Sequence, residues 1–160
     1  MADIALIISR HGAGLARVAA SYEADRALQE DLLQEILIAI HRALPSLQDP
    51  ERLTPFVYRI AHNRSVTHVM KRAGERRRTL EIEPEEEVPS PEQLMIADER
   101  NRRVGAAIRR LPLRYRQVMS LVLEDLNYAE IAEALGISLS NVGVRVNRAK
   151  AQLRTMLDDD

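Results

Sequence analysis

The chain of 160 residues contains no cysteine, no tryptophan and only one phenylalanine. Without cysteine it can form no disulfide, thiolate metal site or thiol nucleophile, which suits the reducing cytoplasm. No apolar run approaches the ~18 residues of a membrane-spanning helix. The first residues, with an early Asp3 and only a short apolar stretch, make a poor signal peptide. The sequence therefore predicts a cytoplasmic protein without membrane insertion.

Residue sets typical of catalysis are also absent. No Ser/His/Asp set, phosphate-cradling glycine loop or paired-carboxylate site is discernible, and Gly12 with Gly14 is too weak a signal to count. His41, His62 and His68 have no acidic or second histidine partner at ligand spacing. We therefore expect no catalysis, no cofactor and no metal site.

The charges nearly balance, at a net −1, but they are unevenly distributed. Residues 59–78 contain seven bases and one acid, and residues 139–157 contain four bases and no acid. Between them, residues 81–92 contain six glutamates and no base. The near-neutral average thus conceals two basic segments, which favour nucleic-acid binding, and an acidic one.

Helical periodicity extends over almost all of the chain outside the acidic segment, and there is no strand signal. Apolar stripes are predicted on two of the N-terminal helices, at Leu33, Ile36, Leu37, Ile40 and Leu44 and at Leu53, Phe56, Val57, Ile60 and Ala61. Three prolines among the glutamates make residues 79–93 a flexible linker. The predicted fold is all-α, with two small helical domains at residues 1–78 and 94–160.

Residues 127–150 carry the strongest motif, a short helix, a glycine turn and a second helix. Asn127 with Glu130 predicts a capping box, Gly136 a left-handed stop, and Ser138 the cap of the last helix. This is the pattern of a DNA-binding helix-turn-helix. The plainer alternative is a helical hairpin with a solvated basic face. The coincidence of the caps, the glycine turn and the acid-free face argues against it.

The last helix presents amide, hydroxyl and cationic groups, which can pair with base edges and phosphates. The predicted DNA contacts are Ser138, Ser140, Asn141, Val144, Arg145, Asn147, Arg148 and Lys150.

The stretch LPLRYRQVMSLVLEDLNYAEIAEALGISLSNVGVRVNRAKAQL, residues 111–153, closely resembles the C-terminal promoter-binding domain of extracytoplasmic-function sigma factors. The resemblance implies that the last helix reads the −35 element. Many members have a Lys-Ser pair where this chain has Gly143 and Val144. That departure removes a phosphate-binding charge and adds apolar surface near the groove, so the resemblance does not carry over the family's base preference.

Residues 31–44, DLLQEILIAIHRAL, resemble the sigma-factor helix that docks on the clamp of the polymerase β′ subunit. The resemblance implies that polymerase binding involves Asp31, Gln34, Glu35 and Ile38. An outward Ile38 among charges suits a protein interface, although periodicity alone equally allows a solvated face with one stray isoleucine.

Residues 53–77 resemble the adjoining family stretch that melts and reads the −10 element. Strand separation needs cations for the backbone and apolar or aromatic surface for an unstacked base. The predicted −10 contacts are Tyr58, Arg59, His62, Asn63, Arg64, Thr67, His68, Lys71 and Arg72. Phe56 falls on the inward stripe and is expected in the core.

The resemblance implies a specificity subunit that binds RNA polymerase core (β′ clamp and β subunit) and promoter DNA. An anti-sigma factor is an optional further partner, since the family usually uses one. The acidic linker is either a plain tether or a segment that threads basic channels of the polymerase. Two alternatives remain: a helix-turn-helix regulator that never joins polymerase, and a protein-interaction module that mimics a sigma factor.

Overall fold

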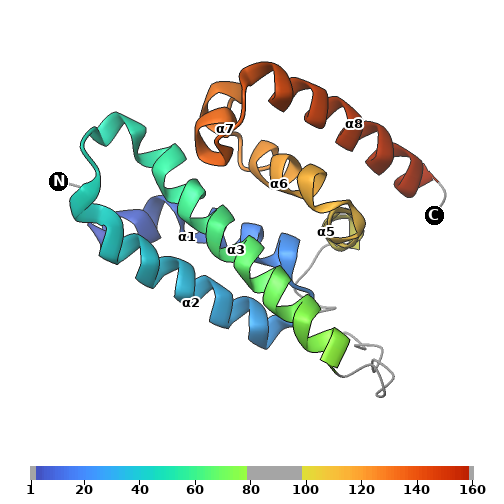
Figure 1. Cartoon of the computed structure of the whole chain (residues 1–160), viewed down its shortest axis with the longest axis horizontal. Helices are drawn as coiled ribbons and strands as arrows, with labels where there is room; N and C mark the ends of the chain where they lie inside the picture. Colours follow the sequence, from blue (N-terminus) through green and yellow to red (C-terminus); the bar gives the residue numbers. More distant parts are fainter. Residues whose placement is uncertain (1–2, 79–98, 159–160) are drawn as a thin grey trace.

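The computed structural model describes residues 3–78 and 99–158, which form helices and their connections with no strand among them. Before the gap lie α1 (Ile4–Tyr22), α2 (Arg26–Ala43) and α3 (Leu53–Arg78); after it follow α5 (Glu99–Arg110), α6 (Leu113–Val122), α7 (Tyr128–Leu135) and α8 (Leu139–Asp158) (Figure 1). The predicted all-α fold is confirmed. The predicted acidic linker, residues 79–93, and the start of the second predicted domain, residues 94–98, lie outside the described residues.

Short polar side chains fix the starts of the N-terminal helices. Asp3 accepts a hydrogen bond of 2.8 Å from the backbone N–H of Leu6, and Asp25 accepts one of 3.0 Å from that of Leu28. Asp49 caps the 3-10 turn Pro50–Arg52, which leads directly into α3, as its Asp-Pro sequence predicts.

The first three helices enclose one core, because α2 packs against both α1 and α3. The apolar stripe on α2 matches the prediction at Ile36 and Ile40, and Leu32 is buried in addition to the predicted residues. Leu32, Ile36 and Ile40 are completely or almost completely buried, whereas Leu33 and Leu37 are only half-buried. Leu32 begins the true i, i+4, i+8 row, and Leu33 and Leu37 flank it at the edge of the contact.

The C-terminal helices enclose a second group of buried side chains, in which α8 packs against α5, α6 and α7. Val142, Val146, Ala149 and Leu153 of α8 are all buried, as their spacing predicts. On the facing helices, Val118 of α6 and Ile131 of α7 have no exposed surface.

The two groups of helices also lie against each other: α7 packs on α3, and α5 and α6 pack on α1 (Figure 1). The sequence predicts two domains on a linker and says nothing of this contact. Along residues 3–78 and 99–158, no helix combines the length and apolarity needed to cross a membrane.

Candidate nucleic-acid and polymerase interfaces

The helix-turn-helix has the predicted local geometry. Asn127 Oδ1 accepts from the N–H of Glu130 at 2.8 Å, and Glu130 Oε1 accepts from the N–H of Asn127 at 3.0 Å. Gly136 has a φ of 68°, the left-handed conformation that glycine adopts without strain. Ser138 Oγ accepts from the N–H of Asn141 at 3.1 Å and so caps α8. These contacts fix the angle at which α8 leaves α7.

The predicted −35 contacts all lie on the outer surface of α8 or at its cap. Seven of them are exposed and Arg145 is half-buried; the exposed set is Ser138, Ser140, Asn141, Val144, Asn147, Arg148 and Lys150. Because a helix turns ~100° per residue, Lys150 lies on the flank of the surface that is centred on Val144. The amide, hydroxyl and guanidinium groups are therefore presented together, with apolar Val144 at their centre.

A tyrosine of the core also contacts this surface. The ring of Tyr115 on α6 is buried, and the guanidinium of Arg114 lies 4.5 Å from its centroid. The Tyr115 hydroxyl accepts a hydrogen bond from Arg114 at 3.4 Å and another from Arg148. The bond from Arg114, and secondarily that from Arg148, hold the pKa of Tyr115 below its usual value. The buried Tyr115 thus orients Arg148, one of the predicted DNA contacts, through its hydroxyl.

On α3 the predicted −10 residues separate into two groups. The outward group shares the exposed side of the helix and consists of Arg59, Asn63, Arg64, Thr67 and Lys71. Met70, with 59% of its surface exposed, lies among them and supplies apolar surface. Two requirements of strand separation, cations and an apolar contact, are therefore present on one helix face.

Tyr58 and His62 point the other way, so the expectation that both face DNA does not match this arrangement. Tyr58 is 3% exposed and lies next to Gly14 of α1 and Glu124 of the C-terminal group. His62 is half-buried, its Nδ1 has no hydrogen-bond partner among the described residues, and burial lowers its pKa to about 4. Helical periodicity could not predict that Tyr58 and His62 face inward, because the side chains that cover them come from segments far from α3 in the sequence.

His68 and Arg72 are held by a buried carboxylate. His68 Nε2 and Arg72 Nε each lie 2.9 Å from Oε1 of Glu23, whose side chain is 6% exposed. The other oxygen of Glu23 accepts from the N–H of Asp25 at 3.0 Å. Burial raises the pKa of Glu23, but the bonds from Asp25, His68 and Arg72 together outweigh it and leave the pKa lowered. These two side chains hold α3 to the α1–α2 connection.

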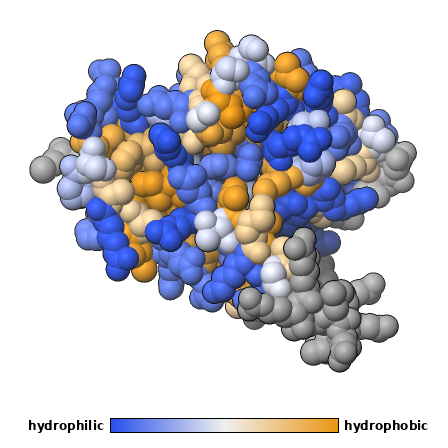
Figure 2. All heavy atoms as spheres, viewed as in Figure 1, coloured by the Kyte–Doolittle hydropathy of each residue, from blue (hydrophilic) through white to orange (hydrophobic). Residues whose placement is uncertain are grey.

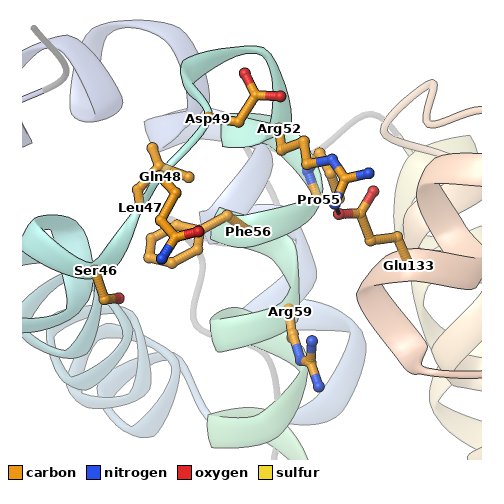
Figure 3. Close-up of a pocket in the computed structure, with 9 residues that line it drawn as sticks. All are labelled: Ser46, Leu47, Gln48, Asp49, Arg52, Pro55, Phe56, Arg59 and Glu133. Atoms are coloured by element: carbon orange, nitrogen blue, oxygen red, sulfur yellow. Dashed lines mark ion pairs between the residues drawn. The ribbon is translucent and has the colours of Figure 1, made fainter.

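A pocket of about 300 Å³ lies at the start of α3, at the connection between α2 and α3, and no sequence motif predicts it. Figure 3 shows the ring of Phe56 under the loop and Arg59 pointing away along α3. The lining residues are Ser46, Leu47, Gln48, Asp49, Arg52, Pro55, Phe56, Arg59 and, from α7, Glu133. Phe56, expected in the core, is half-buried and offers its ring to this pocket.

The predicted polymerase contacts lie together on the side of α2 away from the core. Asp31, Gln34 and Glu35 are exposed, and Ile38 between them is 51% exposed. Figure 2 shows hydrophobic residues interspersed with hydrophilic ones over α2 and α3. A partly apolar face rimmed by charge has the composition of a protein interface.

No group of three or more His, Asp or Glu side chains that could hold a metal occurs in the described part of the chain. His62 and His68 face different neighbours, as given above. The outward surfaces of α3 and α8 present cationic, amide and apolar side chains.

A helix-turn-helix and a second cation-bearing helix on one chain are features of a DNA-binding protein. The chain matches the family model for sigma-70 region 2 at residues 7–75 and that for sigma-70, region 4, at residues 101–153. RNA polymerase sigma factor SigZ of Bacillus subtilis is 30% identical over 137 residues, which cover 84% of this chain and 75% of that protein. RNA polymerase sigma factor NccH of Alcaligenes xylosoxydans is 29% identical over 94% of this chain and 84% of its own length.

Two solved structures are similar over nearly the whole chain. One is CnrH in complex with the cytosolic domain of CnrY, at a TM-score of 0.71 and 25% identity, covering 98% of this chain and 88% of that one. The other is the sigma factor RpoE with the anti-sigma factor NepR from Bartonella quintana, at a TM-score of 0.79 and 20% identity, covering 97% and 96%; it supports the fold alone.

The chain belongs to the sigma-70 family, in its extracytoplasmic-function group, and is a sigma factor that directs transcription initiation. The resemblance identified from the sequence is confirmed. It is favoured over a helix-turn-helix regulator that acts without polymerase, because the region 2 match covers the N-terminal helices that such a regulator would not need.

Proposed function

We propose that this sigma factor binds RNA polymerase core through the exposed face of α2 and places promoter DNA on α3 and α8. The observation that carries the proposal is the presence of three separate exposed faces on one chain: Asp31 to Ile38 on α2, Arg59 to Lys71 on α3, and Ser138 to Lys150 on α8. Residues 1–78 would then act on core and the −10 element, and residues 94–160 on the −35 element.

The −10 contacts are assigned to the outward side chains of α3, with the pocket beside them as the site for one unstacked base. A volume of about 300 Å³ is enough for a nucleobase. Phe56 offers a ring face, Arg59 donors, and Gln48 and Asp49 polar groups to the base edge. Met70 supplies a second apolar contact further along the helix.

We further propose that the protein works in the cytoplasm, catalyses no reaction itself and has an anti-sigma factor as a partner. CnrH, which is 25% identical to this chain, was solved in complex with the cytosolic domain of CnrY, and the fold is shared with RpoE in complex with the anti-sigma factor NepR. The absence of any recognisable catalytic set in the sequence supports the second point.

Reconstituted transcription tests the assignment. Core polymerase with this chain should give run-off transcripts from a small set of start sites, which are mapped on total genomic DNA. Arg148→Ala should weaken use of those promoters by about 1–3 kcal/mol if it contacts a base. Arg154→Ala, on the same helix but nearer its end, is the matched control and should change promoter use little. A chain that binds duplex promoter tightly but never supports core transcription would refute the proposal.

For the pocket, Arg59→Ala and Phe56→Leu should each reduce open-complex formation, whereas Arg26→Ala on the exposed side of α2 should not. Opening is followed with 2-aminopurine placed in the −10 element. Equal opening by all three variants would remove the pocket from the DNA-contacting surface.

A further inference from the structure

The outward face of α8, a helix that runs along the outside of the molecule (Figure 1), has an apolar residue at its centre. Val144 is 44% exposed, with Ser140 one turn before it and Arg148 one turn after it. Its methyl groups add little to the core, because the buried row of α8 lies on the opposite side of the helix. A single exposed valine needs no explanation on most surfaces, but this one lies among the side chains assigned to the −35 element.

A valine cannot pair with the hydrogen-bonding groups of a base. In the major groove every base pair presents donors or acceptors, and only thymine adds an apolar group, its C5 methyl. A polar base edge that is covered by valine loses its water without gaining a partner, which is unfavourable. Val144 therefore favours a thymine opposite it and disfavours the other bases by the same contact.

The residue before Val144 is a glycine for which the fold gives no reason. Gly143 lies inside α8 and does not have the positive φ of Gly136. A Cβ at Gly143 would make only an ordinary contact, 3.9 Å from Cε2 of Tyr128. Glycine in a helix interior is less favourable than alanine, because it loses more conformational freedom on folding. The missing side chain thus weakens α8 without improving the packing of this chain.

The same glycine lies at the edge of the outward face. Gly143 is about 100° from Val144 around the helix, between the outward face and the buried row. A bare backbone at this flank lets α8 approach the wall of a groove more closely than any larger residue would. Closer approach matters for Val144, because its short side chain must come within about 4 Å of a base to touch it.

We propose that Val144 is the specificity-determining residue for a thymine in the −35 element, which it recognises by the C5 methyl, and that Gly143 lets α8 enter the major groove deeply enough for this contact. The inference deepens the proposed function and rests on it, since it takes α8 as the helix that contacts the −35 element. One thymine of that element is then selected through its methyl group and not through its hydrogen-bonding edge.

Removing the methyl group from the DNA tests the contact directly. Start-site mapping with core polymerase supplies the promoter, and each thymine of its −35 element is replaced in turn by deoxyuridine, which lacks only the C5 methyl. The full chain is used with core polymerase, at a concentration that limits transcription. Substitution of the thymine that faces Val144 should lower run-off transcription about three- to fivefold, the effect of one buried methyl group.

The variant Val144→Ala assigns this methyl effect to the valine. It removes both methyl groups from an exposed position, so the fold should be unaffected. The ratio of transcription from the thymine promoter to that from the deoxyuridine promoter should fall to nearly one, which a merely structural role of Val144 would not cause. Thr155→Ala, exposed on the same side of α8 three turns further along, is the control and should keep the wild-type ratio.

The outcomes separate this inference from the proposed function. If no thymine shows the methyl effect, or if Val144→Ala keeps it, the role of Val144 is overturned and the sigma assignment stands. If the wild-type chain directs no promoter-specific transcription with core polymerase, the proposed function fails and the inference fails with it.

Gly143→Ala should move stability and promoter use in opposite directions. The added methyl group should raise the midpoint of thermal unfolding by about 1–4 °C and lower run-off transcription at least about threefold, because α8 can no longer approach the groove as closely. Gly12→Ala is the matched control. Gly12 is also helical and half-buried, and its added Cβ would lie 3.6 Å from Cγ2 of Ile8, so stability should rise while transcription stays the same. Unchanged transcription in Gly143→Ala, or a lower midpoint of unfolding, would overturn the role of this glycine.

Discussion

Arg72 on α3 and Glu23 in the α1–α2 connection form an ion pair of 2.9 Å whose acidic side chain is almost fully buried. Arg72 belongs to a basic segment, and the sequence alone places it on the DNA-contacting face. The structure gives it a different task. Together with His68, it ties the long helix α3 to the first two helices and so sets the direction in which the outward −10 side chains point.

Replacing Glu23 by Gln should therefore destabilise the N-terminal helices. The variant removes the carboxylate that pairs with the half-buried Arg72, and we expect a loss of about 2 kcal/mol in the free energy of unfolding at pH 7. Urea titration of the full chain measures it. The matched control is Glu30→Gln, whose carboxylate is exposed and lies 3.7 Å from Arg26, and it should cost less than about 0.5 kcal/mol.

The ion pair of Glu23 with Arg72 also predicts how the free energy of unfolding changes at acid pH. Because the pKa of Glu23 is lowered in the folded protein, its contribution is fully present above the unfolded value of 4.5 and is lost as pH falls through the folded value. The difference in stability between wild type and Glu23→Gln should accordingly shrink below pH 4.5. A difference that stays constant down to pH 3 would contradict the assignment.

His62 predicts acid lability in a higher pH range. Its pKa is lowered to about 4 by burial, so between pH 6.5 and 4 the unfolded chain binds more protons than the folded one. Stability should fall by roughly 1–3 kcal/mol over that range, and His62→Leu should remove this part of the dependence. His41→Leu, at an exposed position, is the control and should leave the slope unchanged; an equal slope in His62→Leu would refute the assignment.

Local features were predictable because neighbouring residues determine them. The capping box of Asn127 and Glu130, the turn at Gly136 and the buried row of α8 all follow from spacing and side-chain type. On α2 the burial of Ile36 and Ile40 was predicted but that of Leu32 was not, since Leu32 and its neighbour Leu33 are equally apolar. Only the packing of α1 and α3 on either side decides that Leu32 is the buried one.

The features that could not be predicted from the sequence depend on residues far apart in the chain. Tyr58 is buried by Glu124, which lies on a different group of helices, and the pocket at the start of α3 includes Glu133. Glu23 gives no sequence signal for its two partners on α3. A basic residue in a basic segment is equally suited to a phosphate or to a buried carboxylate, and only the fold distinguishes the two.

The exposed isoleucine of α2 allows a matched test of polymerase binding. Ile38→Asp places a charge in the middle of the proposed interface and should weaken binding to core polymerase at least about tenfold, because the charge would be desolvated there. Ile8→Asp on α1 is the control: Ile8 is 50% exposed against 51% for Ile38, so the cost to folding should be similar and small. Fluorescence anisotropy with labelled chain measures the affinity, and equal binding by both variants would exclude the α2 face.

Tyr115 should matter to promoter binding although its ring is buried. Tyr115→Phe keeps the ring and removes only the hydroxyl that accepts from Arg148, so we expect the affinity for a −35 duplex to fall about three- to tenfold while the stability changes by less than about 1 kcal/mol. Because the effect acts through Arg148, it should be absent in an Arg148→Ala background. A double-mutant cycle measured by anisotropy tests this coupling. Additive losses would show that the hydroxyl acts independently of the arginine. An unchanged affinity in Tyr115→Phe would show that the contribution of Arg148 to DNA binding does not depend on its hydrogen bond with Tyr115.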